Sequence, residues 1–291
     1  MNRTVKADAD LQKAEETLRL IQERQVTYSH MVPTQFVRLL DLPEDVRAGY
    51  DVSSLRNMVH GAAPCPQEVK RQMIEWWGDT IQEYYAATEG GGTVITAKEW
   101  LERPGSVGLA WPGSEIRIYD EDGVQQPAGT IGTVYMQLMA DFEYKGDDAK
   151  TKANRIENFF TVGDLGELDE DGYLYLRDRK ADMIISGGAN IYPAEIEGEL
   201  INHPAVQDVA VFGIPNADWG EEIKAVVELH EGFEPSDELA AEITAWAGTR
   251  MGKFKLPRSI DFVDQLPREP NGKLIKRKLR DPYWEGVDRQ I

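Results

Sequence analysis

The sequence has 291 residues, 41% of them hydrophobic, and 32 basic against 51 acidic residues give it a formal net charge of −19. The length allows two domains, each with its own core, and the apolar content predicts a folded chain. The acidic excess disfavours binding to nucleic acid. The single Cys65 excludes an internal disulfide framework and a cysteine-based metal cluster. No apolar stretch is long enough for a transmembrane segment and no signal-peptide core begins the chain, so we expect a cytoplasmic protein.

The first predicted element is a helix with one buried face. Its apolar residues recur at helical spacing, at Leu11, Ala14, Leu18 and Ile21. The segment VTYSHMVPT follows, which we interpret as a strand that runs into a turn at Pro33.

A second amphipathic helix is predicted to begin just after Pro66, with Val69, Met73 and Trp76 on its apolar face. The short strand TIQEYY comes next. Alternation of strands and helices over residues 1 to about 100 predicts a parallel α/β layer.

From about residue 101 to 178 the pattern is typical of antiparallel strands. Short alternating runs such as EIRIYD, GTVYMQ and GYLYLRD are punctuated by Pro112-Gly113, Asp122-Gly123 and Asp171-Gly172. We expect a small barrel or a curled sheet in this β-rich region.

The last region predicts a compact α+β domain. A short helix is expected over Glu195–Ile201 after Pro193, followed by the strands VQDVAVFGI and IKAVVELHE. A further helix should begin after Ser236, a suitable N-cap, and end at Gly248. The polar stretch over residues 179–182 is the expected linker to this domain.

Two segments of the first region are candidates for ligand binding. The small residues Gly61-Ala62-Ala63-Pro64 would let a flat ligand lie against the backbone, although such runs are more often plain turns. Tyr85-Ala86-Ala87-Thr88-Glu89 enters a flexible run of three glycines. Its ring, hydroxyl and carboxylate could stack a base, bind a phosphate and hold Mg²⁺, but an ordinary strand end with an exposed Glu fits it equally well.

Four later segments have similar chemistry. Asp164, between two glycines, could accept both hydroxyls of a ribose, and Arg179 could bind ribose or phosphate. The segment 186–190 is expected to be a tight hairpin loop whose backbone can approach a ligand. Lys273 follows the Pro- and Gly-rich loop 267–272 and could neutralise charge that develops in adenylyl transfer.

Six motifs, in this order, resemble those of one superfamily: HMVPT, GAAP, YAATEG, FFTVGDLG, DRKADMIISGGANIYPAEIE and LPREPNGK. It is the adenylate-forming superfamily of acyl-CoA synthetases, firefly-type luciferases and peptide-synthetase adenylation domains. The resemblance extends from about residue 20 to the end, and it is closest to bacterial fatty-acyl or aryl-CoA ligases.

This resemblance implies two domains. Residues 1–180 would be the C-terminal part of the large AMP-binding domain, with an α/β part over 1–100 and a β-rich part over 101–178. Residues 181–291 would be the small C-terminal domain of AMP-binding enzymes.

The resemblance also implies an activity. Such enzymes convert a carboxylic acid and ATP, with Mg²⁺, into an acyl adenylate, and the acyl group then passes to CoA. A fatty acid is the favoured substrate by resemblance alone. Glu89 would bind Mg²⁺, and Lys273 would be the adenylation lysine, acting with Thr88 and Glu89. The nucleotide would be bound by Gly61, Ala62, Ala63, Pro64, Tyr85, Ala86, Thr88, Asp164 and Arg179.

The remaining implied roles concern the acyl group, CoA and a hinge. His30 would border the acyl pocket, and Ser186, Gly187 and Gly188 would meet the pantetheine of CoA. The small domain would rotate about Ala181, where many relatives have Asp or Lys. With Ala at this position, any polar anchoring of one hinge state is lost.

The family's Gly/Ser/Thr-rich phosphate loop is not found in these residues, and Asn271 stands where Thr or Ser is common. We therefore expect the chain to be a C-terminal portion that lacks half of the large domain. Its first 100 residues should be poorly stable alone, whereas 182–291 should fold independently. Two alternatives stay open: a ligase that loads a carrier protein, and a non-catalytic nucleotide- or CoA-binding fragment with a separate N-terminal half.

Overall fold

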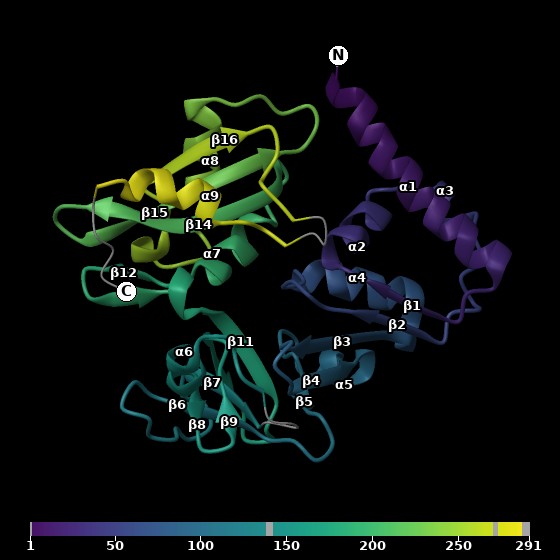
Figure 1. Cartoon of the computed structure of the whole chain (residues 1–291). Helices are drawn as coiled ribbons and strands as arrows, with labels where there is room; N and C mark the ends of the chain where they lie inside the picture. The colour runs from purple at the N-terminus through teal and green to yellow at the C-terminus, as the bar shows by residue number, and fades with distance from the viewer. Residues whose placement is uncertain (1, 138–141, 270–272, 287–291) are drawn as a thin grey trace. The chain divides into compact units, whose positions relative to one another are not determined.

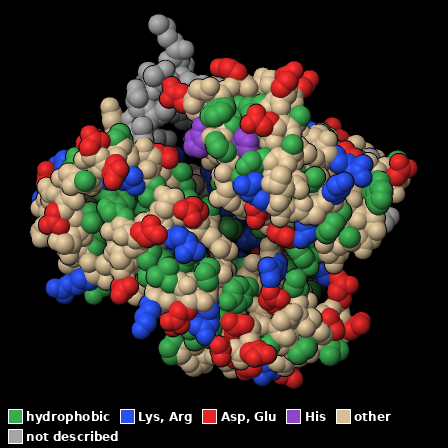
Figure 2. Space-filling model, turned by 180° about the vertical axis from the view of Figure 1, so that it is seen from behind, with side chains coloured by type: hydrophobic (Ala, Val, Ile, Leu, Met, Phe, Trp, Pro, Cys, Tyr) green, Lys and Arg blue, Asp and Glu red, His purple; other side chains and the backbone are tan. Residues whose placement is uncertain are grey.

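The structure is a computed structural model that describes residues 2–137, 142–269 and 273–286, with only the backbone described for residues 2–11. The chain divides into two compact units, Met1–Val162 with Glu167–Leu176 and Gly163–Gly166 with Arg177–Ile291. Acidic and basic side chains are interspersed on the face seen in Figure 2. In the part of the chain that the structure describes, no helix combines the length and the apolar character needed to cross a bilayer.

The first unit begins with a five-stranded sheet in the order β1-β2-β3-β4-β5 (Figure 1). Strands β1, β2 and β3 are parallel, which confirms the predicted parallel layer, whereas β4 and β5 are added antiparallel. The elements of this part are α1 (Asn2–Arg24), β1 (Tyr28–Met31), α2 (Pro33–Leu40), α3 (Glu44–Ala48), β2 (Asn57–His60), α4 (Gln67–Trp77), the 3₁₀ turn η1 (Gly78–Thr80), β3 (Ile81–Ala86), β4 (Gly92–Thr96), α5 (Ala97–Glu102) and β5 (Leu109–Ala110).

The predicted first helix is confirmed as α1, and its Ala14, Leu18 and Ile21 are buried in the first hydrophobic core. Leu11 lies among the residues whose side chains are not described. The predicted turn at Pro33 is wrong, because Pro33 is the first residue of helix α2. Proline suits this position, since its fixed φ is helical and the first residue of a helix needs no N–H partner.

Helix α4 begins directly after Pro66, as predicted. Its buried side differs from the predicted stripe, since Val69 and Trp76 are only partly buried. The buried positions are Lys70, Met73, Ile74 and Trp77. The prediction missed part of the buried side of α4 because Lys70 lies there. A pattern of apolar residues does not count a lysine as a core residue.

A six-stranded sheet follows in the order β11-β10-β7-β9-β8, with β6 paired to β7. The pairs β6–β7, β7–β9 and β8–β9 are antiparallel, in agreement with the sequence prediction. The turn glycines Gly113, Gly123 and Gly172 all have φ between 75° and 87°, the left-handed region that glycine enters at little cost. The elements are β6 (Ile116–Tyr119), β7 (Gly132–Gln137), α6 (Asp148–Ala153), β8 (Arg155–Ile156), β9 (Phe159–Phe160), β10 (Asp164–Leu168) and β11 (Leu174–Arg179).

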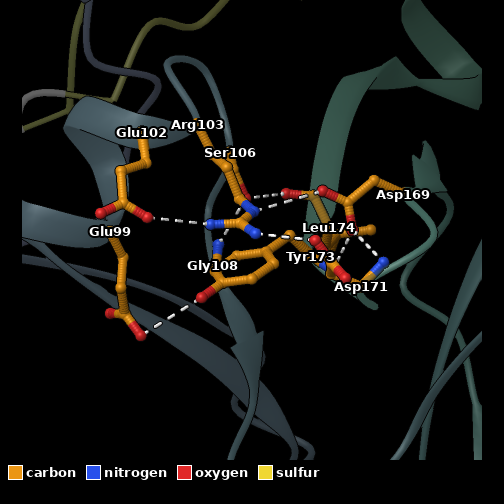
Figure 3. A network of polar contacts seen from close by, with 9 residues as sticks. All are labelled: Glu99, Glu102, Arg103, Ser106, Gly108, Asp169, Asp171, Tyr173 and Leu174. Carbon is orange, nitrogen blue, oxygen red and sulfur yellow. Dashed lines mark hydrogen bonds and ion pairs between the residues drawn. The ribbon is translucent and has the colours of Figure 1, made fainter.

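A polar cluster, which we call the Arg103 clasp, links the end of α5 to the turn between β10 and β11 (Figure 3). The Arg103 guanidinium lies 2.7 Å from a carboxylate oxygen of Asp171 and 4.2 Å from the ring centre of Tyr173. The backbone beside it is also paired, since Ser106 Oγ donates to the Leu174 carbonyl at 2.9 Å. The clasp therefore joins segments of the first unit that are 68 residues apart in sequence.

The second unit contains a five-stranded sheet in the order β13-β12-β15-β14, with β16 parallel to β15. Alternate residues of β15 are buried on one side, at Ile223, Ala225, Val227 and Leu229, as predicted. The other side of the sheet is covered as well, because Phe212 and Val226 pack with Leu266. The elements are η2 (Lys180–Asp182), β12 (Ile184–Ser186), β13 (Ala189–Ile191), α7 (Pro193–Leu200), β14 (Val206–Asn216), β15 (Gly220–Leu229), α8 (Asp237–Ala247), η3 (Lys253–Lys255), β16 (Ser259–Val263), α9 (Arg277–Arg280) and η4 (Asp281–Trp284).

Two of its helices test the predicted start signals. Ser236 caps α8 by accepting a hydrogen bond from the Leu239 amide at 3.1 Å, and Gly248 follows its last residue, both as predicted. Helix α7 starts earlier than predicted, at Pro193. The prediction placed Pro193 before the helix, whereas Pro193 is its first residue, as Pro33 is in α2.

Candidate functional site

The ends of three parallel strands bring several predicted site residues to one edge of the first sheet. His30 lies near the end of β1, Gly61 follows the last residue of β2, and Tyr85 and Ala86 end β3. Because the carboxyl ends of parallel strands face the same way, these residues share an edge. Ligands of open α/β sheets bind at this kind of edge.

The turn that begins at Gly61 is shaped by a close contact with Tyr84. A Cβ added at Gly61 would lie 2.5 Å from a ring carbon of Tyr84 and 2.8 Å from its carbonyl oxygen. Ala62 then adopts φ of 69°, a left-handed conformation that is uncommon outside glycine. The predicted Gly61–Pro64 segment is therefore a constrained turn with Ala62 and Pro64 exposed.

Tyr84 also contacts the predicted acyl-pocket residue. Nε2 of His30 lies 3.1 Å from the Tyr84 hydroxyl, and the two rings are 5.7 Å apart between centres. The sequence analysis did not select Tyr84. Its place beside Tyr85 on β3 gives no local sign that it would meet His30, 54 residues earlier.

Thr88 and Glu89 lie in the connection between β3 and β4. Thr88 is exposed, and Glu89 accepts a hydrogen bond from the Tyr144 hydroxyl at 2.7 Å. Burial of Tyr144 and its hydrogen bond to Glu89 raise its pKa to about 12, so the phenol is a proton donor at neutral pH. Tyr144 is a second contact that sequence reasoning missed.

The glycines after Glu89 are not the open, flexible loop that we expected. A Cβ at Gly91 would lie 2.8 Å from Cβ of Met136, and one at Gly92 would lie 2.5 Å from the Tyr85 carbonyl oxygen. Both glycines are buried, and Gly92 is the first residue of β4. The run therefore allows close packing against β7 and β3, and only Gly90 has no heavy atom within 4 Å of an added Cβ.

The described residues can be tested for a fit to Mg²⁺. Within them, no three His, Cys, Asp or Glu side chains gather as a ligand set for a metal ion. Mg²⁺ bound with a nucleotide often takes only one or two carboxylates, and its other ligands are phosphates and water. The partly exposed carboxylate of Glu89, next to the exposed Thr88, fits an Mg²⁺ ion that is bound together with a nucleotide.

A buried polar cluster that the sequence analysis did not identify includes His60, the residue before Gly61, together with Lys70 and Glu83. Lys70 forms an ion pair with Glu83, and both side chains are less than a tenth exposed. His60 is fully buried at the end of β2, and neither ring nitrogen has a hydrogen-bond partner. Burial lowers the pKa of His60 to about 3, with further contributions from Lys70 and His30, so its ring is neutral. Cys65 is packed here too, and burial raises the pKa of its thiol, which argues against a nucleophile.

In the second unit, two predicted ribose-binding residues contact one another. Nε of Arg179 lies 3.4 Å from Oδ1 of Asp164, and the Asp164 side chain is 11% exposed whereas that of Arg179 is 51% exposed. The Lys180 amide donates to the Gly163 carbonyl at 2.8 Å, which holds the two segments together. The carboxylate is therefore fixed while the guanidinium stays accessible.

Lys273 is exposed at the end of its loop, of which residues 270–272 lie outside the described chain. The loop is closed at its base, since the Glu269 amide donates to the Lys273 carbonyl at 2.8 Å. Arg268 is held by Asp208, with 3.0 Å between Nε and Oδ2. The backbone next to Lys273 is thus anchored to the second unit.

The predicted hairpin at Ser186, Gly187 and Gly188 is confirmed as the β12–β13 turn, and both glycines have positive φ. Gly187 donates its N–H to the Trp219 carbonyl at 2.8 Å, and a Cβ on Gly187 would lie 2.5 Å from the Trp219 ring. Trp219 is 49% exposed, and the Arg258 guanidinium lies 5.5 Å from its ring centre. An exposed Trp in the polar turn NADWGEE was a signal that could have revealed this surface.

The predicted site residues therefore fall into two groups, one in each unit. His30, the Gly61 turn and the Tyr85–Glu89 segment belong to the first unit. Asp164, Arg179, Ala181, the Gly187 hairpin and Lys273 belong to the second.

Two family models match the chain. The model described as AMP-binding enzyme matches residues 3–138, and the model described as AMP-binding enzyme C-terminal domain matches residues 195–273. The chain therefore belongs to the AMP-binding, adenylate-forming enzymes.

Individual relatives agree with this assignment. The chain is 35% identical over 272 residues to the long-chain-fatty-acid–CoA ligase FadD13 of Mycobacterium tuberculosis, covering 93% of this chain and 53% of that protein. It is 31% identical to the fatty acid–[acyl-carrier-protein] ligase ScoC of Streptomyces coeruleorubidus, over 96% of this chain and 54% of that one. ATP-bound MatB from Rhodopseudomonas palustris superposes with a TM-score of 0.82 at 34% identity, over 93% of this chain and 53% of that one. The chain thus spans about half the length of these relatives.

Proposed function

We propose that this chain takes part in the ATP-dependent activation of a carboxylic acid to an acyl adenylate and in the transfer of the acyl group to CoA. The observation that supports it most strongly is the shared edge of β1, β2 and β3. There, in a chain of the AMP-binding family, the first unit's predicted nucleotide residues lie at the same edge as His30, the predicted acyl-pocket residue. A fatty acid is the proposed substrate, since FadD13 and ScoC are named for fatty acids.

In the first unit, the Gly61–Pro64 turn and Tyr85–Ala86 would line the adenine, and Thr88 would bind a phosphate. Glu89 would hold Mg²⁺, which when bound neutralises charge on the phosphates of ATP. His30 would border the acyl group. The constrained turn at Gly61 supports this arrangement, because a rigid backbone needs little ordering when a flat base binds.

In the second unit, Asp164 would accept the ribose hydroxyls and Arg179 would bind ribose or phosphate. Lys273 would stabilise charge as a carboxylate oxygen of the acid attacks the α-phosphorus and pyrophosphate leaves. Its contribution would be electrostatic, with no covalent step. The closed base of its loop supports this role, since it limits the positions that the ammonium can reach.

For the second step, the thiol of CoA would attack the acyl carbon and AMP would leave. The Ser186–Gly188 hairpin would meet the pantetheine. We extend this site to Trp219 and Arg258, because an exposed ring beside a guanidinium suits the base and phosphate of a nucleotide.

We also propose that residues 1–180 belong to a large AMP-binding domain and residues 181–291 to a small C-terminal one, with a hinge at Ala181. The division of the chain near residue 177 supports this boundary. A separate N-terminal half that completes the large domain remains part of the proposal.

A carrier-protein thiol is the second candidate acceptor. The similarity to ScoC, named as an acyl-carrier-protein ligase, favours it. AMP release in the presence of acid and ATP distinguishes the two, since it should depend on CoA in one case and on a holo carrier protein in the other.

The proposed activity is tested by acid-dependent exchange of labelled pyrophosphate into ATP, with the purified 291 residues and a panel of fatty and aryl acids. Exchange that is lost in Lys273→Ala would support the proposal for this chain alone. If a folded sample shows no exchange but binds an adenylate analogue, the non-catalytic alternative with a separate N-terminal half is favoured. A sample that neither exchanges nor binds the analogue would overturn the proposal.

A further inference from the structure

The C-terminal segment reaches back to the residue proposed as the hinge. Arg280, the last residue of α9, donates from its Nη1 to the Ala181 carbonyl and to Oδ1 of Asp182, both at 3.3 Å. Its other two nitrogens contact Oδ1 of Asp281, at 3.2 and 3.3 Å. The Arg280 side chain is 18% exposed, so these bonds are partly shielded from water.

A second cation of the same segment is held by helix α7. Nζ of Lys276 lies 2.8 Å from Oε1 of Glu197, which also accepts the Val211 amide at 2.7 Å. Burial alone would lower the pKa of Lys276, but Glu197 and Asp178 outweigh it and raise the pKa, so the ammonium stays charged. Lys276 is therefore fixed three residues after Lys273.

Helix α7 also holds Asp178, three residues before the proposed hinge. Oδ2 of Asp178 accepts the Ala194 amide at 2.8 Å, in the first turn of α7, and its Oδ1 accepts the Arg179 amide at 2.7 Å. The strand that enters the hinge and the segment that contains Lys273 are thus attached to the same short helix.

Beyond Arg280 the segment is attached to the sheet. Nε1 of Trp284 donates to the Gly213 carbonyl of β14 at 3.0 Å, and the Tyr283 hydroxyl donates to Asp261 of β16 at 3.0 Å. Arg280 therefore projects from a segment that is fixed on both sides. A guanidinium held in this way can restrict the backbone that it contacts.

We propose that Arg280 and Lys276 are positioning residues that form a latch, which fixes the Ala181 hinge and joins it to the segment bearing Lys273. The side chain of Ala181 cannot make a polar contact of its own, and the latch supplies one to its carbonyl instead. The hinge at Ala181 and the loop that ends at Lys273 would then change conformation together. The hinge role of Ala181 rests on the proposed function, whereas the latch itself can be measured in the resting protein.

Hydrogen exchange followed by mass spectrometry tests the latch in the full chain, without turnover. In Arg280→Gln we expect the amides of residues 180–183 to exchange about tenfold faster, since a charge-assisted hydrogen bond contributes about this factor to local stability. Protection of α8 and of the β14–β15 pair should not change. Arg280→Lys should fall in between, because an ammonium lacks the planar fork by which the guanidinium contacts Ala181, Asp182 and Asp281 at the same time.

Lys278→Gln is the matched control, since it removes an exposed positive charge from the same helix and should leave hinge exchange at the wild-type rate. Asp182→Asn weakens only one of the two hinge contacts and should accelerate exchange less than Arg280→Gln. The latch is refuted if Arg280→Gln exchanges like the wild type at residues 180–183, or if Lys278→Gln accelerates it equally. Loss of pyrophosphate exchange with an intact latch would instead count against the proposed function.

Discussion

The Tyr144 hydroxyl donates a hydrogen bond to Oε1 of Glu89 across 2.7 Å, and the two residues are 55 positions apart in sequence. The bond uses one carboxylate oxygen and leaves the other available. It therefore fixes the direction in which Glu89 presents its charge. A carboxylate fixed in this way is better prepared to bind a metal ion than one that rotates freely.

Tyr144→Phe should weaken nucleotide binding about fivefold when Mg²⁺ is present, because one hydrogen bond contributes about 1 kcal/mol to this orientation. Binding in the presence of EDTA should change little. Calorimetric titration of ATP, with and without Mg²⁺, measures both values. Tyr135→Phe, on β7, is the control, and an equal loss with and without Mg²⁺ would show that Tyr144 does not act through Glu89.

The buried His60 should make the stability of the first unit depend on pH. The unfolded chain protonates His60 near pH 6.5, whereas burial lowers its pKa in the folded chain to about 3. Between these values the unfolded state binds more protons, so stability should fall as the pH falls, by at most about 1.4 kcal/mol per pH unit. Denaturant unfolding followed by tryptophan fluorescence at pH 7, 6 and 5 measures the slope.

His60→Leu isolates this contribution. Leu can fill the site beside Phe36 without the unpaired ring nitrogens, so we expect similar or higher stability at pH 7 and a shallower slope below pH 6.5. Burial also raises the pKa of Glu83, and this effect makes stability rise as the pH falls. Because Glu83 is present in both the wild type and His60→Leu, it does not account for a difference between their slopes. An unchanged slope in His60→Leu would contradict the assignment to His60.

Local signals in the sequence were sufficient for much of the fold. The start of α8 follows from the Ser236 hydroxyl, its end from Gly248, and the strand β15 from the alternation of Ile223 to Leu229. Each of these depends on neighbours within a few residues. The family motifs likewise supplied the residues of the candidate site, and three of them, His30, Gly61 and Tyr85, lie at one edge of the first sheet.

The features that were missed depend on pairs distant in sequence. Lys70 reads as a surface residue until its partner Glu83 is known, and Arg280 meets Ala181 over a separation of 99 residues. The sequence next to Lys70 or Arg280 gives no indication of its distant partner. The flexible loop expected from three consecutive glycines was wrong for a related reason, because Met136 of β7 occupies the space beside Gly91.

The two glycines of the β12–β13 hairpin should respond differently to substitution. Both have positive φ, 59° at Gly187 and 81° at Gly188, so alanine at either position should cost about 1 kcal/mol in backbone strain. Only Gly187→Ala also forces a Cβ against the Trp219 ring. It should lower the melting temperature more than Gly188→Ala does and should shift tryptophan emission.

The background Trp219→Phe identifies the source of this emission change. In that background Gly187→Ala should produce no further shift, whereas a shift that persists would mean that another tryptophan responds. Equal melting temperatures for the two alanine variants would show that Trp219 moves aside at no cost.

The Arg103 clasp should depend on the shape of the side chain as well as on its charge. Nε of Arg103 lies 3.7 Å from Asp169, its terminal nitrogen lies 2.7 Å from Asp171, and its plane covers Tyr173. Lysine keeps the charge but cannot make the planar stacking contact together with both ion pairs. Arg103→Ala should therefore destabilise the first unit by about 1–2 kcal/mol, and Arg103→Lys should recover less than half of the loss.

A double-mutant cycle with Asp171→Asn separates the ion pair from the stacking contact. Because the Asp171 side chain is 67% exposed, water screens the pair, and we expect a coupling energy of only about 0.5 kcal/mol. Hydrogen exchange over residues 167–176 should accelerate in Arg103→Ala, and much less in Asp171→Asn, since only the second variant keeps the contact of Arg103 with the Tyr173 ring. The bond between Ser106 and Leu174 is present in both variants. Full recovery by lysine would mean that charge alone holds the clasp, and the stacking of Arg103 on Tyr173 would then contribute nothing to the link between α5 and the β10–β11 turn.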